Sequence, residues 1–230
     1  MVSSFETVSE NNLIRRRNRK PTIWIKGDPA VGEASQVLAK LQPRIIEEVK
    51  LPPGYALEWA GEFEDSAKAQ AGLASKLPVI GILIVLIVIS LFNSLRKPLI
   101  IFLTVPLAVI GVTVGLLSMN QPFGFMALLG FMSLVGMLIK NAIVLVDEFG
   151  LQTSEGKDPY HAVVDSGLSR CRPVAMAAAT TVLGMIPLVP DAFFVSMAVT
   201  IMFGLTFATI LTLIVVPTLY TIIFRIKIPK

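Results

Sequence analysis

The hydrophobic pattern divides the chain into a polar first third and a second part dominated by long apolar runs. From Leu77 onward, five runs approach the length of about 20 residues that a helix needs to cross a bilayer core. They cover residues 77–92, 99–119, 124–149, 173–189 and 194–224. The first run is expected to continue a helix that begins near Phe63. The pattern therefore predicts a polytopic α-helical membrane protein, with a transmembrane domain of five helices over residues 77–230.

The polar part, residues 1–76, shows shorter and mixed periodicities. "PTIWIKGD" predicts a strand, and "GEASQVLAKLQPRIIEEV" has helical apolar spacing with Pro43 as a possible break. "YALEWAGE" alternates apolar and polar positions, which is typical of a half-buried strand. We expect a partial α/β subdomain of the strand–helix–strand kind. A unit of about 55 residues buries little core by itself, so it should need more chain or a partner.

The charges between the apolar runs predict the orientation of the chain. Lys and Arg occur in "NSLRKP", in "LQTSEGKDPYHAVVDSGLSRCR" and in the tail "FRIKIPK", whereas "NQPFG" and "VPDAFF" carry none. Cytoplasmic loops of membrane proteins are enriched in these residues. The pattern places the three cationic segments and the C-terminus in the cytoplasm, and the polar N-terminal part outside.

Composition excludes several other classes of function. The chain is 54% hydrophobic and 16% charged, whereas soluble domains average about 45–50% and about 25%. The net charge of +4 is not arranged as a basic stripe with aromatics, so nucleic-acid binding is not indicated. The single Cys171 and the single His161 exclude an internal disulfide and a zinc site of the two-histidine kind. The N-terminus has no apolar region of the kind that a signal peptide contains. The spans hold no paired catalytic groups, so we do not expect the chain to be an enzyme.

The third run contains an unusual lysine, in "GMLIKNAIVLVDEF". A lysine near the bilayer centre costs roughly 2.5–3.5 kcal/mol on insertion scales. On a helix, Ser133, Gly136, Lys140 and Asp147 fall on one stripe, with Lys140 about 10 Å along the axis from Asp147. That separation is too long for direct pairing, and Glu148 is about 12 Å away. No other acidic residue lies deep in a run, so the natural partner of Lys140 is missing from the sequence.

Alternatives remain open for these side chains. Lys140 could bond a backbone carbonyl at a packing interface or snorkel, although intramembrane charges mark ion or substrate pathways by default. Asp147 and Glu148 could simply be solvated near the cytoplasmic end. Asn141 could orient a neighbour or only pack.

The fourth run has one helical face of small residues, formed by Pro173, Ala177, Thr180 and Gly184. A tight helix–helix contact explains most of them, but the hydroxyl of Thr180 could also donate to a buried carboxylate. Arg170 and Arg172 precede this run and could anchor it at the membrane interface.

At these residues the chain resembles the resistance–nodulation–division (RND) exporters, specifically the C-terminal end of the hydrophobe/amphiphile efflux branch. The matching pieces are "RRRNRKPTI", "LPPGYALEWAGEFEDS", "KNAIVLVDEF", "SRCRPVAMAAATTVLGMIPL" and "ATILTLIVVPTLYTIIF", in family order and spacing. The resemblance implies the last part of a periplasmic porter domain followed by transmembrane spans eight to twelve.

The resemblance also implies a partner for Lys140. In RND exporters the matching lysine pairs with two aspartates on the fourth span, and their titration drives the cycle. That span belongs to the N-terminal half, so we expect this chain to be a C-terminal fragment. Arg170 matches the family arginine before the eleventh span. The family threonine aligns with Ala177, and Thr180 is our candidate replacement. The expected proton-relay residues are Lys140, Asn141, Asp147, Arg170 and Thr180.

By the same resemblance, the whole protein should be a proton-driven efflux pump that uses the proton-motive force and no cofactor. It should be a homotrimer, multi-pass in the inner membrane, working with the missing N-terminal half, a periplasmic adaptor and an outer-membrane channel. An amphiphilic compound is the expected substrate. A heavy-metal RND exporter is the nearest alternative. From another class, the chain could be a nonfunctional truncated product or a membrane anchor.

Overall fold

The computed structural model describes residues 13–27, 29 and 34–226, which divide into two compact units, residues 1–30 and 31–230. In the first unit, β1 (Arg16–Arg17) pairs antiparallel with β2 (Lys20–Pro21). The turn residues Asn18 and Arg19 have φ values of 51° and 68°, as a tight two-residue hairpin requires. The described part of this unit is therefore one short hairpin.

The second unit begins with α1 (Ala34–Glu48), which confirms the predicted helix. Pro43 lies inside α1 without ending it, so the proline removes one backbone hydrogen bond but does not break the helix. The two predicted strands are wrong over the described residues: residues 22–27 and 55–60 form no strand. A strand needs a neighbouring edge for its backbone hydrogen bonds, and among the described residues neither segment forms a ladder with one.

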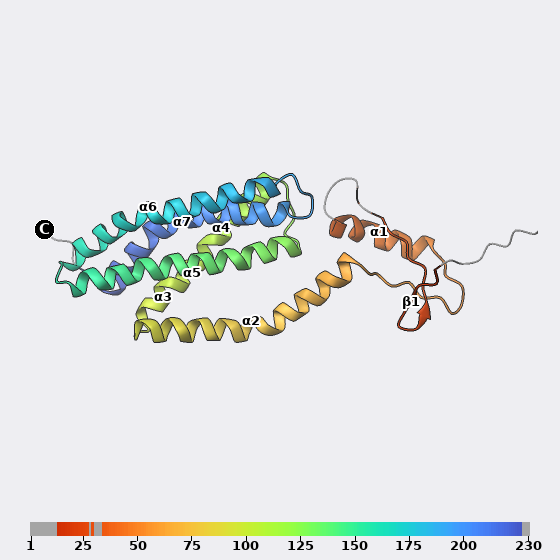
Figure 1. Cartoon of the computed structure of the whole chain (residues 1–230), viewed down its shortest axis with the longest axis horizontal. Coiled ribbons are helices and arrows are strands. Elements are labelled where there is room, and N and C mark those ends of the chain that lie inside the picture. The colour runs from red at the N-terminus through yellow and green to blue at the C-terminus, as the bar shows by residue number, and fades with distance from the viewer. Residues whose placement is uncertain (1–12, 28, 30–33, 227–230) are drawn as a thin grey trace, which may run out of the picture. The chain divides into compact units, whose positions relative to one another are not determined.

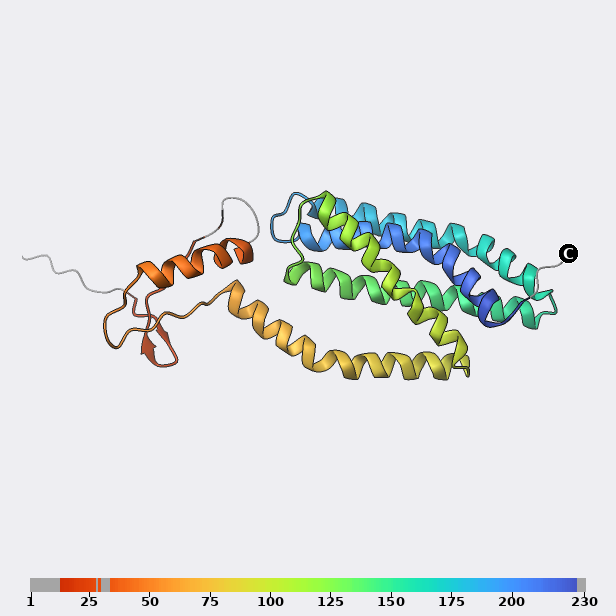
Figure 2. The same cartoon turned by 180° about the vertical axis from the view of Figure 1, so that it is seen from behind.

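Five spans long and apolar enough to cross a membrane follow, which confirms the predicted number. The first is α2 (Glu62–Phe92), and the second consists of α3 (Arg96–Leu103) and α4 (Val105–Ser118). The third is α5 (Phe125–Ser154). The fourth is α6 (Pro159–Met185) with the 3₁₀ turn η1 (Ile186–Leu188), and the fifth is α7 (Val195–Ile223). Figures 1 and 2 show these helices from two sides.

The second span is interrupted at Thr104. Pro106 has no backbone N–H to continue the helical hydrogen bonds, and it lies in the first turn of α4, where a proline is tolerated. The Thr104 hydroxyl donates a 2.6 Å hydrogen bond to the carbonyl oxygen of Ile101, and Thr104 is fully buried. The span therefore consists of two helical segments rather than the single helix that the apolar run predicts.

The fourth helix begins earlier than predicted. α6 starts at Pro159 and continues through Pro173, where the apolar run begins. The Asp158 carboxylate accepts hydrogen bonds from the backbone N–H groups of Tyr160 and His161, at 3.2 and 3.5 Å, which is an N-cap. Arg170 and Arg172 consequently lie inside a helix and not in a loop before it.

The central helix of the bundle is α7, which packs on α4, α5 and α6. Glycines allow the closest approach: a Cβ on Gly111 of α4 would lie 2.6 Å from the Cβ of Phe207 and 2.8 Å from the Phe203 carbonyl oxygen. Gly204 of α7 is packed against Leu134 and Val112 in the same way. Small residues of this kind let membrane helices meet backbone to backbone.

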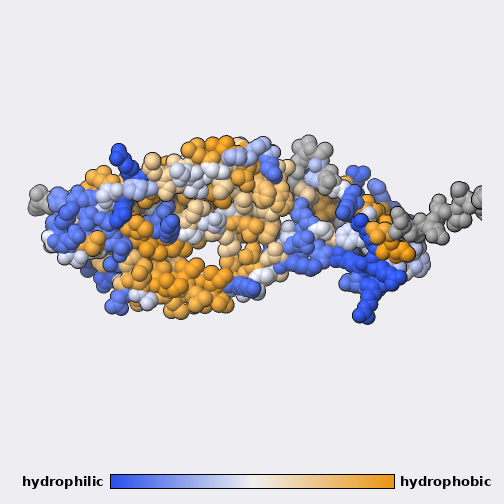
Figure 3. All heavy atoms as spheres, viewed as in Figure 1, coloured by the Kyte–Doolittle hydropathy of each residue, from blue (hydrophilic) through white to orange (hydrophobic). Residues whose placement is uncertain are grey.

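The outer faces of the spans are apolar. Figure 3 shows orange side chains over α2 and along the sides of the other helices, and blue ones at the end where α5 meets α6. Only 6% of the most apolar window of α2 is buried inside the described chain, against 50% for α7. The apolar surface matches what a bilayer would contact.

Candidate functional site on the open face of α5 and α6

The two sides of α5 differ in burial. One side is buried against the neighbouring helices through Leu134, Leu138, Ala142, Leu145 and Phe149. The other side is exposed at Ser133, Gly136, Lys140, Val144 and Asp147. The stripe predicted from helical spacing is therefore a real, uncovered face of the helix.

Lys140 has no acidic partner among the described residues. Ion pairs among the described residues include Arg44–Glu48, Lys68–Glu64, Lys157–Asp165 and Arg170–Glu148, and none involves Lys140. Gly136, one turn before Lys140, has nothing within 4 Å of where its Cβ would be. The ammonium group thus lies on an open helix face with room for another helix to approach.

The matching face of α6 is also open. Pro173, Ala177, Thr180 and Gly184 are all exposed. The Thr180 hydroxyl donates a 3.0 Å hydrogen bond to the Ala177 carbonyl oxygen. A hydroxyl also has acceptor lone pairs, so this contact leaves Thr180 able to accept a hydrogen bond. Its role in a relay stays a prediction.

The remaining predicted relay residues lie along α5. Asn141 is half-buried beside Lys140, and Asp147 is exposed on the stripe two turns further on. The structure gives neither side chain a hydrogen-bond partner among the described residues. They share the helix with Lys140 but are not joined to it.

Arg170 takes a partner that the sequence does not predict. Its Nη2 donates to Oε2 of Glu148 on α5, and this carboxylate also accepts a 3.0 Å hydrogen bond from Nε2 of Gln152. The Glu148 side chain is 14% exposed and that of Arg170 is 39% exposed. Glu148 is therefore a half-enclosed counter-ion and not a freely solvated acid.

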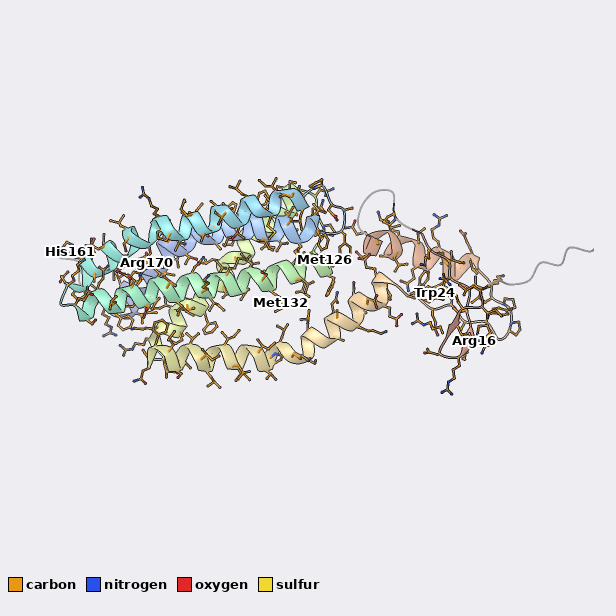
Figure 4. All side chains as sticks on the ribbon, viewed as in Figure 1. Arg16, Trp24, Met126, Met132, His161 and Arg170 are labelled. Atoms are coloured by element: carbon orange, nitrogen blue, oxygen red, sulfur yellow. The ribbon has the colours of Figure 1, made fainter. Side chains whose placement is uncertain are left out.

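The hydrogen-bond chain continues into the α5–α6 turn. Lys157 donates to Oε1 of Gln152 at 3.2 Å and pairs with Asp165 of α6, also at 3.2 Å. Figure 4 labels Arg170 on α6, near the end marked by His161, and labels Met126 and Met132 further toward the other end of α5. The polar cluster ties the two helices together at this end, about two turns from Lys140.

Chemically, this face is one half of an ion-pair site. It presents an ammonium and a guanidinium on neighbouring helices, and Lys140 has no carboxylate of its own among the described residues. No group of three or more His, Cys, Asp or Glu residues that could hold a metal ion occurs in the described part. The arrangement can bind and stabilise carboxylates supplied by another helix.

Comparison with known proteins gives the family. The model of the AcrB/AcrD/AcrF family matches residues 1–224. The nickel and cobalt resistance protein CnrA of Cupriavidus metallidurans is 30% identical over 93% of this chain and 20% of its own length. The multidrug export protein AcrF of Escherichia coli is 29% identical over 92% of this chain and 21% of its own length.

A solved structure agrees with this match. A crystal structure of a heavy metal efflux pump matches with a TM-score of 0.64 and 32% identity, over 84% of this chain and 20% of that one. The chain spans about a fifth of the length of these relatives, which include both metal and multidrug exporters. The chain belongs to the AcrB/AcrD/AcrF family of RND efflux transporters.

Proposed function

We propose that this chain supplies the cationic half of a proton relay in an RND exporter. The observation that carries the proposal is Lys140, an unpaired ammonium on an exposed small-residue face in the middle of a membrane span. Charged side chains within membrane spans are rare and by default mark ion or substrate pathways. The complementary acids are two aspartates on the fourth span, in the half of the transporter that this chain does not contain.

In this relay, protonation of the aspartates changes what Lys140 contacts. Ionised carboxylates attract the ammonium, and proton uptake releases it. The open faces of α5 and α6 allow a helix to move against them, because Gly136 and Gly184 have nothing within 4 Å of a Cβ position. Proton uptake from one side and release to the other would then drive the conformational cycle of the pump. No bond is made or broken in the substrate, so the protein is not an enzyme.

We propose an amphiphilic compound as the substrate and the inner membrane as the location. A trimer that works with a periplasmic adaptor and an outer-membrane channel completes the assembly. A second candidate substrate is a divalent metal cation, which the resistance protein CnrA favours by name. Efflux assays of the whole transporter with ethidium and with Ni²⁺ separate the two, because only the true substrate class should be expelled against its gradient.

The chain alone should transport nothing. Lys140 has no acid to pair with, so no proton can be coupled to movement of a substrate. We expect that producing residues 1–230 in a strain lacking its efflux pumps leaves susceptibility to ethidium and to Ni²⁺ unchanged. The whole transporter should lower the susceptibility to one of these two compounds. A reproducible gain of resistance from residues 1–230 would contradict the proposed half-site.

The two ends of α5 should lie on opposite sides of the membrane. Ser154 ends α5, and the α4–α5 loop at its other end contains Asn120 and Gln121. Asn120 has φ of 49°, where a cysteine would be strained, so Gln121→Cys is the better probe. In a Cys171→Ser background, a membrane-impermeant maleimide added to whole cells should label Gln121→Cys, and it should label Ser154→Cys only after permeabilisation. Labelling of both from the same side would refute the orientation predicted from loop charges.

A further inference from the structure

The ion pair between Glu148 and Arg170 has a place in the proposed relay. Arg170, Pro173, Ala177 and Thr180 fall on one side of α6 by helical spacing. That side is the open face of the helix, where Ala177 and Thr180 are exposed. Arg170 is therefore the cation at the end of this face. Its guanidinium pairs with Glu148 of α5. Glu148 lies about 80° around the axis of α5 from Lys140.

Arg170 retains unused donors. A guanidinium has five N–H groups, and the structure uses one nitrogen, Nη2, for the contact with Glu148. No other partner of Arg170 occurs among the described residues. The same side chain can thus serve a second carboxylate, or leave Glu148 for it. Arg172, two residues further on, is exposed and forms no ion pair within the described chain.

The carboxylate of Glu148 is oriented toward Arg170 by neighbouring hydrogen bonds. The hydrogen bond from Gln152 orients one carboxylate oxygen, and Gln152 is itself held by Lys157. The other oxygen faces the guanidinium. Because this hydrogen bonding fixes the carboxylate in one orientation, the carboxylate can pair with the arginine without first changing its rotamer.

We propose that Glu148 is a positioning residue that competes with the relay carboxylates of the missing half for Arg170. This inference rests on the proposed function. While Arg170 is paired with Glu148, its charge is largely compensated, and the relay carboxylates bind protons more readily. When Arg170 turns to them, it favours their ionised form and promotes proton release. Glu148 thereby sets the pH range in which the relay works.

Other charged or titratable groups lie near the pair and are unchanged in the Glu148 variants. Lys97 of α3 has its Nζ 3.0 Å from the position of a Cβ on Gly150, and Tyr220 of α7 packs its ring on Phe149 with centroids 4.9 Å apart. Among the described residues, Asp147 on α5, Asp165 on α6 and Lys157 in the turn are further charged groups at this end of the two helices.

The test is the pH profile of efflux by the whole transporter, measured with whichever of ethidium and Ni²⁺ it expels while the external pH is varied. Glu148→Gln leaves the charge of Arg170 uncompensated, so the relay carboxylates should hold protons less tightly. The pH of half-maximal efflux should then move to lower pH by about 1 unit. Asp165→Asn is the matched control, since it removes a carboxylate of the same cluster that does not touch Arg170, and its profile should not move.

The outcomes are decisive in both directions. An unchanged profile in Glu148→Gln, or an equal displacement in Asp165→Asn, overturns the inference and leaves Glu148 as a structural tie between the helices. If Glu148→Gln does not assemble, Glu148→Asp takes its place. It keeps the charge on a shorter stem, so the pH profile should move in the same direction by less. An unmoved profile in Glu148→Asp would then contradict the inference. Efflux that survives Lys140→Met defeats the proposed function itself. Loss of efflux in Lys140→Met with an unmoved Glu148→Gln profile defeats only the inference.

Discussion

Lys140→Met should abolish transport by the whole RND exporter while leaving it folded. Methionine is unbranched and apolar, so it enters a membrane helix more easily than lysine, which costs roughly 2.5–3.5 kcal/mol at the bilayer centre. Lys140 is exposed within the described part of this chain, so a methionine there does not disturb the packing of the five spans. The relay carboxylates lose their counter-charge and remain protonated, so efflux falls to background. Drug or metal susceptibility of a pump-deleted strain, at equal membrane abundance, measures the loss.

Two further substitutions separate charge from position. Lys140→Arg keeps the charge but replaces a compact ammonium by a planar fork, and we expect most of the transport to be lost. Lys76→Met is the matched control, because Lys76 is an exposed lysine of α2 away from the open face, and its transport should stay near normal. Near-normal efflux in Lys140→Met would make Lys140 a packing or anchoring residue.

Gly204→Val should strongly destabilise the membrane bundle. A Cβ at this position would contact Leu134 and lie 2.9 Å from Cγ2 of Val112, and both neighbours are buried. Overpacking of this kind costs typically 1–3 kcal/mol, and valine adds two methyl groups beyond the Cβ. The α4–α7 contact should therefore open, and the bundle depends on α7 because it packs on α3, α4, α5 and α6. The shift in melting temperature is measured by heating the detergent-solubilised transporter and determining the folded fraction by size-exclusion chromatography.

Gly81→Val is the control for the change of residue type. Gly81 lies on α2 in the membrane, and nothing lies within 4 Å of a Cβ there. Valine has a higher helix propensity than glycine, so this variant should melt no earlier than the wild-type protein. Equal melting of the Gly204→Val and Gly81→Val proteins would show that the close α4–α7 approach contributes nothing to stability.

The membrane part was largely predictable because two strong physical constraints act on it. A span must be apolar over about 20 residues, so composition alone identified the five helices. Helical spacing of 100° per residue placed Ser133, Gly136 and Lys140 on one stripe, and all three are exposed. The absence of an acid near Lys140 was also visible, because only Asp147 and Glu148 occur on that helix.

The parts that were mispredicted depend on contacts beyond the local pattern. The apolar run suggested that the fourth helix begins at Pro173, whereas the N-cap at Asp158 followed by Pro159 starts it; that Asp-Pro pair is a readable start signal. Because α6 reaches back this far, Arg170 comes beside Glu148, which lies 22 residues earlier in the sequence. Spacing alone could not pair them. The strands expected over residues 21–28 and 55–62 had suitable alternation, but over the residues described only Pro21 pairs, as part of β2, and the rest forms no ladder.

In the proposed relay, Lys140 couples proton movement to transport. The most direct measurement reconstitutes the whole transporter in liposomes with a pH-sensitive dye inside and imposes a pH gradient. Adding substrate should accelerate proton flux through the wild-type protein. In Lys140→Met, substrate should still bind, but the proton flux should stay at the level of empty liposomes. Substrate-stimulated proton flux of wild-type size through Lys140→Met would show that Lys140 is not the coupling residue.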